Sequence, residues 1–190
     1  MAKTFDAITD HMRAWVARQP MFFVGTAPLD PDGHVNVSPK GPISTLAILG
    51  DHELAYLDFS GSGAETVAHV RENGRIVIML CAFEGPPRIV RFHGTGRVVR
   101  WDEPEFATWM ERFDFADASI PEARRSIIVV DVARVSDSCG YGVPLMAFEG
   151  LREHHALSCA KQLRVKGPEA YEAYKGTKNA RSLDGLPSVD

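Results

Sequence analysis

Apolar and polar residues alternate at the period of β-strands through much of the first 135 residues. Two such runs, "MFFVGTAPL" and "HVNVSPKG", are joined by Asp30-Pro31-Asp32-Gly33, where proline presets one backbone dihedral and glycine tolerates a positive one. This arrangement predicts a β-hairpin. Further strands, bounded by turn residues, are predicted at 43–49, 53–59, 75–83, 88–100 and 126–135. Short strands joined mostly by tight turns predict a mainly β fold, an antiparallel barrel.

Helical spacing marks the segments around these strands. Apolar residues from Phe5 to Val16 recur every three or four positions, which predicts a packing helix over 4–18. Further helices are predicted at 62–72, 102–113, 152–164 and 168–175. The apolar faces of the first two are expected to cover the barrel openings.

The whole chain, residues 1–190, is predicted to form one domain. It consists of the helix at 4–18, a barrel over 20–136 and a C-terminal extension over 137–190, with loop, helical and extended parts. The last residues, "KGTKNARSLDGLPSVD", have little core-forming potential of their own. We expect them to be disordered or held by a partner surface.

Composition narrows the possible partners. The 190 residues are 45% hydrophobic and 24% charged, which suffices for one buried core. A net charge of −4 gives no general attraction to nucleic acid or to an anionic membrane, so any anion site must be local. No window has the roughly 18 apolar residues of a membrane span. The odd number of cysteines, without metal-ligand spacing, indicates reduced thiols and a cytoplasmic protein.

A loop of alternating serine and glycine lies between a predicted strand and a predicted helix, in "DFSGSGAETVAHVRENGR". Ser62 and Glu65 have the spacing of a capping box, in which each side chain binds the backbone N–H of the other. The same segment offers free helix N–H groups and two glycines that allow close approach, as in a phosphate cradle. The two roles are compatible, and the local sequence leaves both open.

The order of these segments resembles the pyridoxamine 5′-phosphate oxidase-like flavoproteins, the FMN-binding split barrels. It is most similar to a branch with the motif "GSGxET…HxRENGR", which "SCGYGVP" and "KNARSLDGLP" also fit. The resemblance covers residues 13–150. It implies a six-stranded, Greek-key-like split barrel that forms a homodimer, with FMN bound in clefts between the subunits.

The resemblance also implies which residues hold FMN. The second hairpin strand would run beside the isoalloxazine ring, with its lysine near flavin and substrate. The end of the strand at 53–59 would line the ribityl chain, and the helix start would meet the phosphate. The tail would either reach the flavin across the dimer or form a simple surface strap. The implied residues are Asn36, Val37, Ser38, Pro39, Lys40, Asp58, Phe59, Ser60, Gly61, Ser62, Gly63, Thr66, Arg91, Asn179 and Ser182.

Two departures from the authentic oxidase bear on ligand and substrate. Glu65-Thr66 stands where the oxidase has an Arg-Lys pair on the phosphate. Either the positive charge comes from elsewhere, with Arg75, Arg91 and Lys40 as candidates, or binding is weaker, or this branch prefers another ligand. The oxidase also has an Arg-x-His near its C-terminus, and "KNARSLDGLP" has no histidine. We therefore expect a different substrate from pyridoxamine phosphate.

The resemblance implies an FMN-dependent oxidoreductase that takes a hydride from a reduced nicotinamide or a small organic donor. No catalytic side chain is named, because the chemistry belongs mostly to the cofactor. Alternatives are a flavin carrier or sensor without turnover, or a split barrel that binds haem, through His93, or deazaflavin F420. The acidic composition disfavours the polyglutamyl tail of F420.

The expected dimer also follows from the pattern of the strands. Apolar residues occur throughout the strands, whereas a small barrel buries one face of each. We expect outward-facing residues such as Phe92 or Met79 to contact the second subunit.

Overall fold

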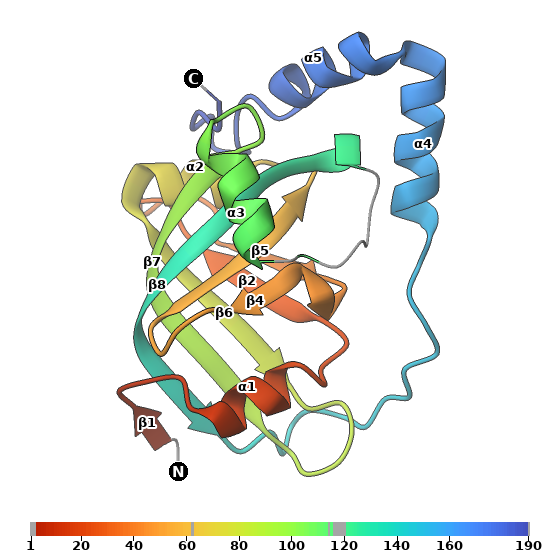
Figure 1. Ribbon diagram of the computed structural model, residues 1–190. Helices are drawn as coiled ribbons and strands as arrows, with labels where there is room; N and C mark the ends of the chain where they lie inside the picture. Colours follow the sequence, from red (N-terminus) through yellow and green to blue (C-terminus); the bar gives the residue numbers. More distant parts are fainter. Residues whose placement is uncertain (1–2, 62, 114, 116–120, 190) are drawn as a thin grey trace.

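The centre of the molecule is an antiparallel sheet that curls into a half-barrel with helices around it (Figure 1). The computed structural model describes residues 3–61, 63–113, 115 and 121–189. In this part of the chain the sheet has eight strands in the order β3-β2-β6-β7-β8-β5-β4, with β1 paired to β8. The strands are β1 (Lys3–Phe5), β2 (Phe22–Thr26), β3 (Asn36–Lys40), β4 (Leu46–Ile48), β5 (Glu53–Phe59), β6 (Arg75–Cys81), β7 (Ile89–Arg100) and β8 (Arg124–Ser138).

The mainly β split-barrel prediction is confirmed, with a different number of strands. Two of the eight strands have only three residues. β1 pairs with the C-terminal end of β8, and β4 pairs with β5 at the end of the strand order. The predicted hairpin is also present, because β2 and β3 pair from Phe22↔Lys40 to Thr26↔Asn36. Its connection contains a hydrogen bond from Gly33 N to Asp30 O at 3.1 Å.

Each helix differs from its predicted bounds at one end or at both. They are α1 (Asp10–Val16), α2 (Glu65–Asn73), α3 (Glu105–Phe113), α4 (His154–Lys166) and α5 (Pro168–Lys178), with 3-10 turns at Ile43–Thr45 and Pro121–Ala123. The N-terminal helix is shorter than 4–18 because the Thr9 side chain caps it and residues 3–5 join the sheet instead. The predicted strand at 43–49 likewise opens with a 3-10 turn.

The two faces of the sheet have different cores. The inner core contains Phe22, Val24, Ile78 and Phe92, and α1 and α2 add apolar residues to it. A second cluster on the other face of β5 and β8 is covered by α3 through Trp109 and neighbouring aromatic residues. Helix α3 therefore covers the outside of the sheet, whereas the sequence had placed it over a barrel opening.

Strand alternation also corrects one of the two outward-facing predictions. Phe92 pairs with Ile78 and is fully buried in the inner core, so it cannot contact a second subunit. Met79 pairs with Arg91, lies on the opposite face and is half-buried. The error is one position, because consecutive strand residues face opposite sides.

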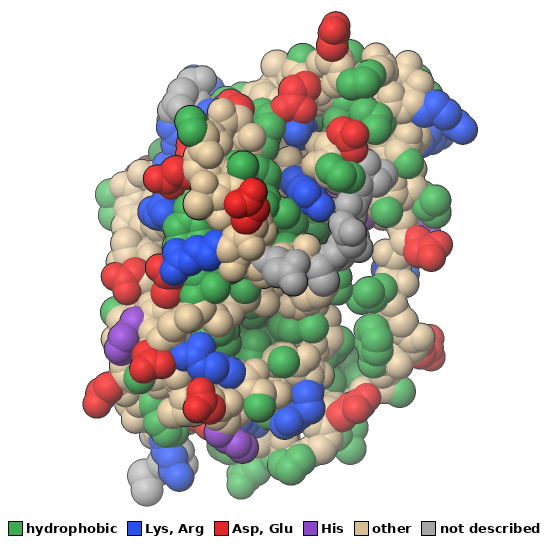
Figure 2. All heavy atoms as spheres, in the orientation of Figure 1, with side chains coloured by type: hydrophobic (Ala, Val, Ile, Leu, Met, Phe, Trp, Pro, Cys, Tyr) green, Lys and Arg blue, Asp and Glu red, His purple; other side chains and the backbone are tan. Residues whose placement is uncertain are grey.

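The C-terminal extension runs along the outside of the half-barrel before α4 and α5 (Figure 1). Its linker, residues 139–153, contacts the barrel where Met146 N donates to Phe83 O at 3.0 Å. Hydrophobic side chains gather along this linker at the right of Figure 2. The exposed apolar residues of the linker are Tyr141, Leu145, Met146, Phe148 and Leu151.

The last residues are held by the chain itself as a surface strap, so the expectation of disorder is wrong. Arg181 and Pro187 form a β-bridge, and Ser188 N donates to Ala180 O at 3.0 Å. Asp184 accepts from His34 N at 2.8 Å, which ties this tail to the β2–β3 hairpin. These attachments are hydrogen bonds that involve backbone groups, and amino-acid composition does not predict them. No helix in the described part of the chain combines the length and apolar character needed to cross a bilayer.

Replacing Phe92 tests the assignment of the two faces. Phe92→Ala should lower the free energy of unfolding by about 3–5 kcal/mol, because it leaves a cavity in the inner core. Urea denaturation measures this, with Val165→Ala on the exposed face of α4 as a control that should change stability by less than about 0.5 kcal/mol. A loss below about 1 kcal/mol for Phe92→Ala would place its ring outside the core.

Candidate functional site

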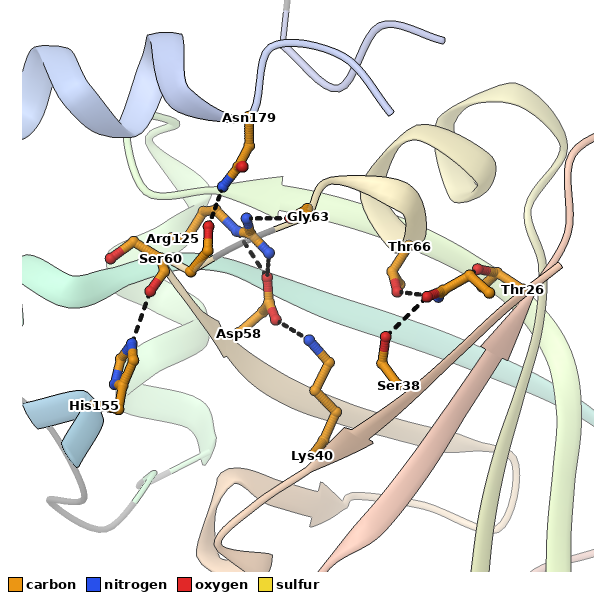
Figure 3. A network of polar contacts seen from close by, with 12 residues as sticks. Thr26, Ser38, Lys40, Asp58, Ser60, Gly63, Thr66, Arg125, His155 and Asn179 are labelled. Carbon is orange, nitrogen blue, oxygen red and sulfur yellow. Dashed lines mark hydrogen bonds and ion pairs between the residues drawn. The ribbon is translucent and has the colours of Figure 1, made fainter. Parts of the chain in front are cut away.

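Polar side chains from the inner face of β3, the end of β5 and the start of α2 lie together with residues of β8 and the C-terminal extension (Figure 3). The fold brings them together because β3 is at one end of the strand order, β5 is next to last at the other end, and the sheet curls between them. The 60–64 loop, which connects β5 to α2, lies at the centre of this region. The described parts of this loop are Ser60, Gly61, Gly63 and Ala64.

Asp58 is the buried anion of this site. Its side chain is 4% exposed and accepts from Lys40 Nζ at 2.7 Å on one oxygen and from Arg125 Nε and Nη2 at 2.9 and 2.5 Å on the other. Burial by itself would raise the pKa of the carboxyl, but the charges and hydrogen bonds of Arg125 and Lys40 outweigh burial and lower the pKa to about 2. These three side chains together carry one net positive charge, and the Glu65 carboxylate at the start of α2 acts on Arg125 with the opposite charge.

A second polar network lies beneath α2. Asn36 Nδ2 donates to the hydroxyls of Thr26 and Thr66 at 3.1 and 3.0 Å, and Ser38 Oγ donates to Asn36 Oδ1 at 2.9 Å. The Thr26 hydroxyl also lies 3.1 Å from Nδ1 of His69, which is fully buried. Burial lowers the pKa of His69 against the opposing charges of Asp184, Glu72 and Glu65, so this imidazole is neutral near pH 7.

The carbonyl groups of the loop are held by side chains from three elements. The Ser60 carbonyl accepts from His155 Nε2 at 2.7 Å, and the Gly61 carbonyl accepts from Asn179 Nδ2 at 2.5 Å. Arg125 Nη1 donates to the Gly63 carbonyl at 2.9 Å. The orientation of these peptide groups is therefore fixed by residues distant in sequence.

The start of α2 differs from the predicted capping box. The helix begins at Glu65, and its N-cap is Ala64, which has no side-chain cap hydrogen bond. The Glu65 carboxylate instead accepts from Leu183 N of the tail at 3.2 Å. Ser62, the other predicted member of the box and a predicted cofactor residue, lies outside the described residues.

The structure places the predicted cofactor residues in two groups. Asn36, Ser38 and Lys40 lie on the inner face of β3, whereas Val37 and Pro39 are exposed on its other face. The residues that lie in or beside the loop region are Asp58, Phe59, Ser60, Gly61, Gly63, Thr66 and Asn179. Ser182 is buried in the turn of the tail, where its hydroxyl accepts from Leu186 N at 3.1 Å.

Two of the three candidate cations lie away from the loop. Arg91 pairs with Ser136, and Asp58 with Ser126, so they are roughly 30 Å apart along β8 at about 3.3 Å per residue. Arg75 follows the far end of α2 and donates to Pro28 O at 2.9 Å. Lys40 is at the site, together with Arg125, which sequence reasoning missed because its strand carries no motif.

The chain matches a known protein family over most of its length. The family model of pyridoxamine 5′-phosphate oxidase matches residues 8–139. The chain belongs to the pyridoxamine 5′-phosphate oxidase family.

Individual relatives agree with this assignment. A pyridoxamine 5′-phosphate oxidase family protein of Aspergillus flavus, ustO, is 38% identical over 97% of this chain and 77% of its own length. Two solved structures share the fold. HupZ of Group A Streptococcus, with 20% identity and a TM-score of 0.51, covers 67% of this chain and 91% of its own. A conserved protein of unknown function from Corynebacterium diphtheriae, with 13% identity and a TM-score of 0.50, covers 73% and 98%.

Asp58→Asn tests how much the buried carboxylate contributes to the stability of this protein. Removing the charge leaves Lys40 and Arg125 without their anion, so the free energy of unfolding near pH 7 should fall by about 3 kcal/mol. The folded-state pKa of about 2 lies below the ordinary value of 3.8, so this carboxylate stabilises the fold above pH 3.8 and loses that effect as the pH falls toward 2.

The stability difference between wild type and Asp58→Asn should therefore shrink as the pH is lowered from about 5 to about 2.5, measured by urea denaturation. Asp51→Asn is the matched control, because Asp51 pairs with Arg13 at an exposed position and should matter by less than about 1 kcal/mol. A difference that stays constant over this pH range would contradict the assignment.

Proposed function

We propose that this chain binds FMN and acts as an FMN-dependent oxidoreductase on a small molecule or a reduced nicotinamide. The observation that carries the proposal is the 60–64 loop. Its carbonyl groups are held by donors, it lies beside the net positive charge of Lys40, Arg125 and Asp58, and it leads into α2 in a member of this family.

The loop fits the phosphate end of FMN. In a trans peptide the N–H of each residue points away from the preceding carbonyl, so holding the carbonyls of Ser60 and Gly63 directs the N–H groups of Gly61 and Ala64 to the other side. No described residue accepts a hydrogen bond from these two N–H groups. Amide groups at a helix N-terminus favour an anion, and the positive end of the α2 dipole adds to this preference.

Gly63 is required by the shape of this cradle. Its φ is +94°, and a Cβ at this position would lie 2.5 Å from Glu65 Oε2. Glu65 accepts from Leu183 N of the tail through Oε1, and its Oε2 lies beside Gly63, so this carboxylate borders the cradle and the amide groups and nearby cations must outweigh its charge. In this proposal Arg125, which donates to the Gly63 carbonyl, and Lys40, which binds Asp58 near the end of β5, provide the positive charge that the Arg-Lys pair provides in the authentic oxidase.

The inner face of β3 fits the ring end of the cofactor. Asn36 and Ser38 are oriented by their hydrogen bonds to each other and to Thr26 and Thr66, and Lys40 is held by Asp58. When bound, FMN would supply the hydride chemistry. The chain would supply orientation and a fixed positive charge. The absence of a histidine after residue 155 favours a substrate other than pyridoxamine phosphate.

A second copy of the chain is part of this proposal. The outer face of β2, β3 and β6 presents Phe23, Met79 and the 66%-exposed Val37, and the linker presents a row of exposed apolar side chains. Exposed apolar side chains gathered on one face often mark a protein–protein interface, so we assign this face to a homodimer.

Val37→Glu should disrupt this dimer, because Val37 is exposed on the outer face and its cross-strand neighbour on β2 is Gly25, which has no side chain to pair with a carboxylate. A carboxylate placed on the outer face would be buried without a partner, so sedimentation velocity at micromolar concentration should show a monomer for the variant and a dimer for the wild type. Val165→Glu on exposed α4 should leave the dimer intact. A monomeric wild type would refute the homodimer.

Gly63→Ala tests flavin binding and phosphate recognition together. Wild type, purified without added cofactor, should show flavin absorption and bind FMN about tenfold or more tightly than riboflavin, because charge-assisted hydrogen bonds to phosphate are strong. Gly63→Ala should weaken FMN binding about tenfold and leave riboflavin unchanged, since the cost falls on the phosphate cradle.

Gly85→Ala is the matched control, because Gly85 also has a positive φ (+68°) but a Cβ there meets nothing within 4 Å. Reduction by NADH or NADPH faster than that of free flavin would support turnover, and binding without such reduction would indicate a flavin carrier. A Soret band, or affinity for F420 but not FMN, would refute the flavin assignment.

A further inference from the structure

The C-terminal extension meets the rest of the molecule at the 60–64 loop. His155 of α4 donates to the Ser60 carbonyl at 2.7 Å, and its ring lies 5.8 Å from that of Phe59 between centroids. Tyr171 of α5 hydrogen-bonds Ser60 Oγ at 2.8 Å, and Asn179 after α5 donates to the Gly61 carbonyl at 2.5 Å. Two helices and the start of the tail thus contact two consecutive loop residues.

These contacts rest on a small core that belongs to the extension. Tyr171 and Cys159 are buried with Ala123, beside the start of β8. Burial raises the pKa of Tyr171 to about 12, so its hydroxyl keeps its proton and remains available to Ser60. Because a carbonyl oxygen can only accept, the hydrogen bond to Ser60 also requires the proton of His155 on Nε2.

The loop needs such external support because of its glycines. Glycine has no Cβ to restrict φ and ψ, so the peptide groups on either side of Gly61 can rotate at little steric cost. The described contacts of the barrel with this part of the loop are the hydrogen bond from Ser60 N to Ala123 O at 2.7 Å and that from Arg125 to the Gly63 carbonyl. The peptide that carries the Gly61 N–H is held on its carbonyl side by His155.

We propose that His155, supported by Asn179, is a positioning residue that sets the phosphate selectivity of the loop. By fixing the Ser60 carbonyl it fixes the direction of the Gly61 N–H, one of the two amides, without an acceptor among the described residues, that the proposed FMN phosphate would use. This inference rests on the proposed FMN function. In this proposal the C-terminal extension affects phosphate recognition without contacting the phosphate.

His155→Ala tests the inference, with His154→Ala as the matched control one residue earlier on an exposed position of α4. Flavin fluorescence titrations should show the ratio of riboflavin to FMN dissociation constants falling about fivefold for His155→Ala, the effect of one lost hydrogen bond, and unchanged for His154→Ala. His155→Gln retains an N–H donor and should recover most of the ratio.

Hydrogen exchange of the protein without flavin provides a second readout. The Ser60 amide, bonded to Ala123 O, should exchange several-fold faster in His155→Ala than in wild type or His154→Ala, because the loop loses its support. A merely structural role of His155 would lower the melting temperature and leave the selectivity ratio unchanged.

The possible outcomes separate this inference from the function on which it rests. A wild type that prefers FMN, together with a His155→Ala variant of the same preference, would overturn the inference and leave the proposed function standing. A wild type that binds FMN and riboflavin equally, or binds neither, would overturn both. A selective loss in His155→Ala, restored in His155→Gln, would support both.

Discussion

The buried carboxylate of Asp58 holds the candidate site together. It fixes Lys40 of β3 and Arg125 of β8, and Arg125 in turn holds the Gly63 carbonyl at the entrance to α2. An ionised carboxylate can be buried at this depth because two cations and their hydrogen bonds compensate the loss of water. One residue thereby couples two strands and the loop, and leaves a net positive charge beside them.

The curvature of the sheet makes this coupling possible. β3 and β5 are separated by several strands in the hydrogen-bonding order, and they meet at the site only because the sheet curls into a half-barrel. Alternation along each strand then divides polar from apolar residues. Asn36, Ser38 and Lys40 face the interior, and their neighbours Val37 and Pro39 face away. The same division leaves apolar side chains on the outer face.

The extension gives this chain a feature beyond the barrel. Its tail attaches through polar groups to α2 and the β2–β3 hairpin, and its helices attach to the loop through His155 and Tyr171. Loops rich in glycine are conformationally free, and hydrogen bonds from rigid helices are an effective way to restrict them. The extension and the barrel therefore build the loop jointly.

The sequence by itself determined the longer strands, the first hairpin, the helical segments and the family, because periodicity and turn residues act over a few neighbouring positions. It missed the three-residue strand β1, which lies where a helix was predicted. It also located Lys40, Asp58 and the 60–64 loop. It did not find Arg125 or the contact of His155 with Ser60, and it placed Phe92 on the wrong face. The tertiary structure decided these points, because an ion pair or hydrogen bond between residues 67 or 95 positions apart depends on how the sheet curls and where the extension packs, and no local pattern records either.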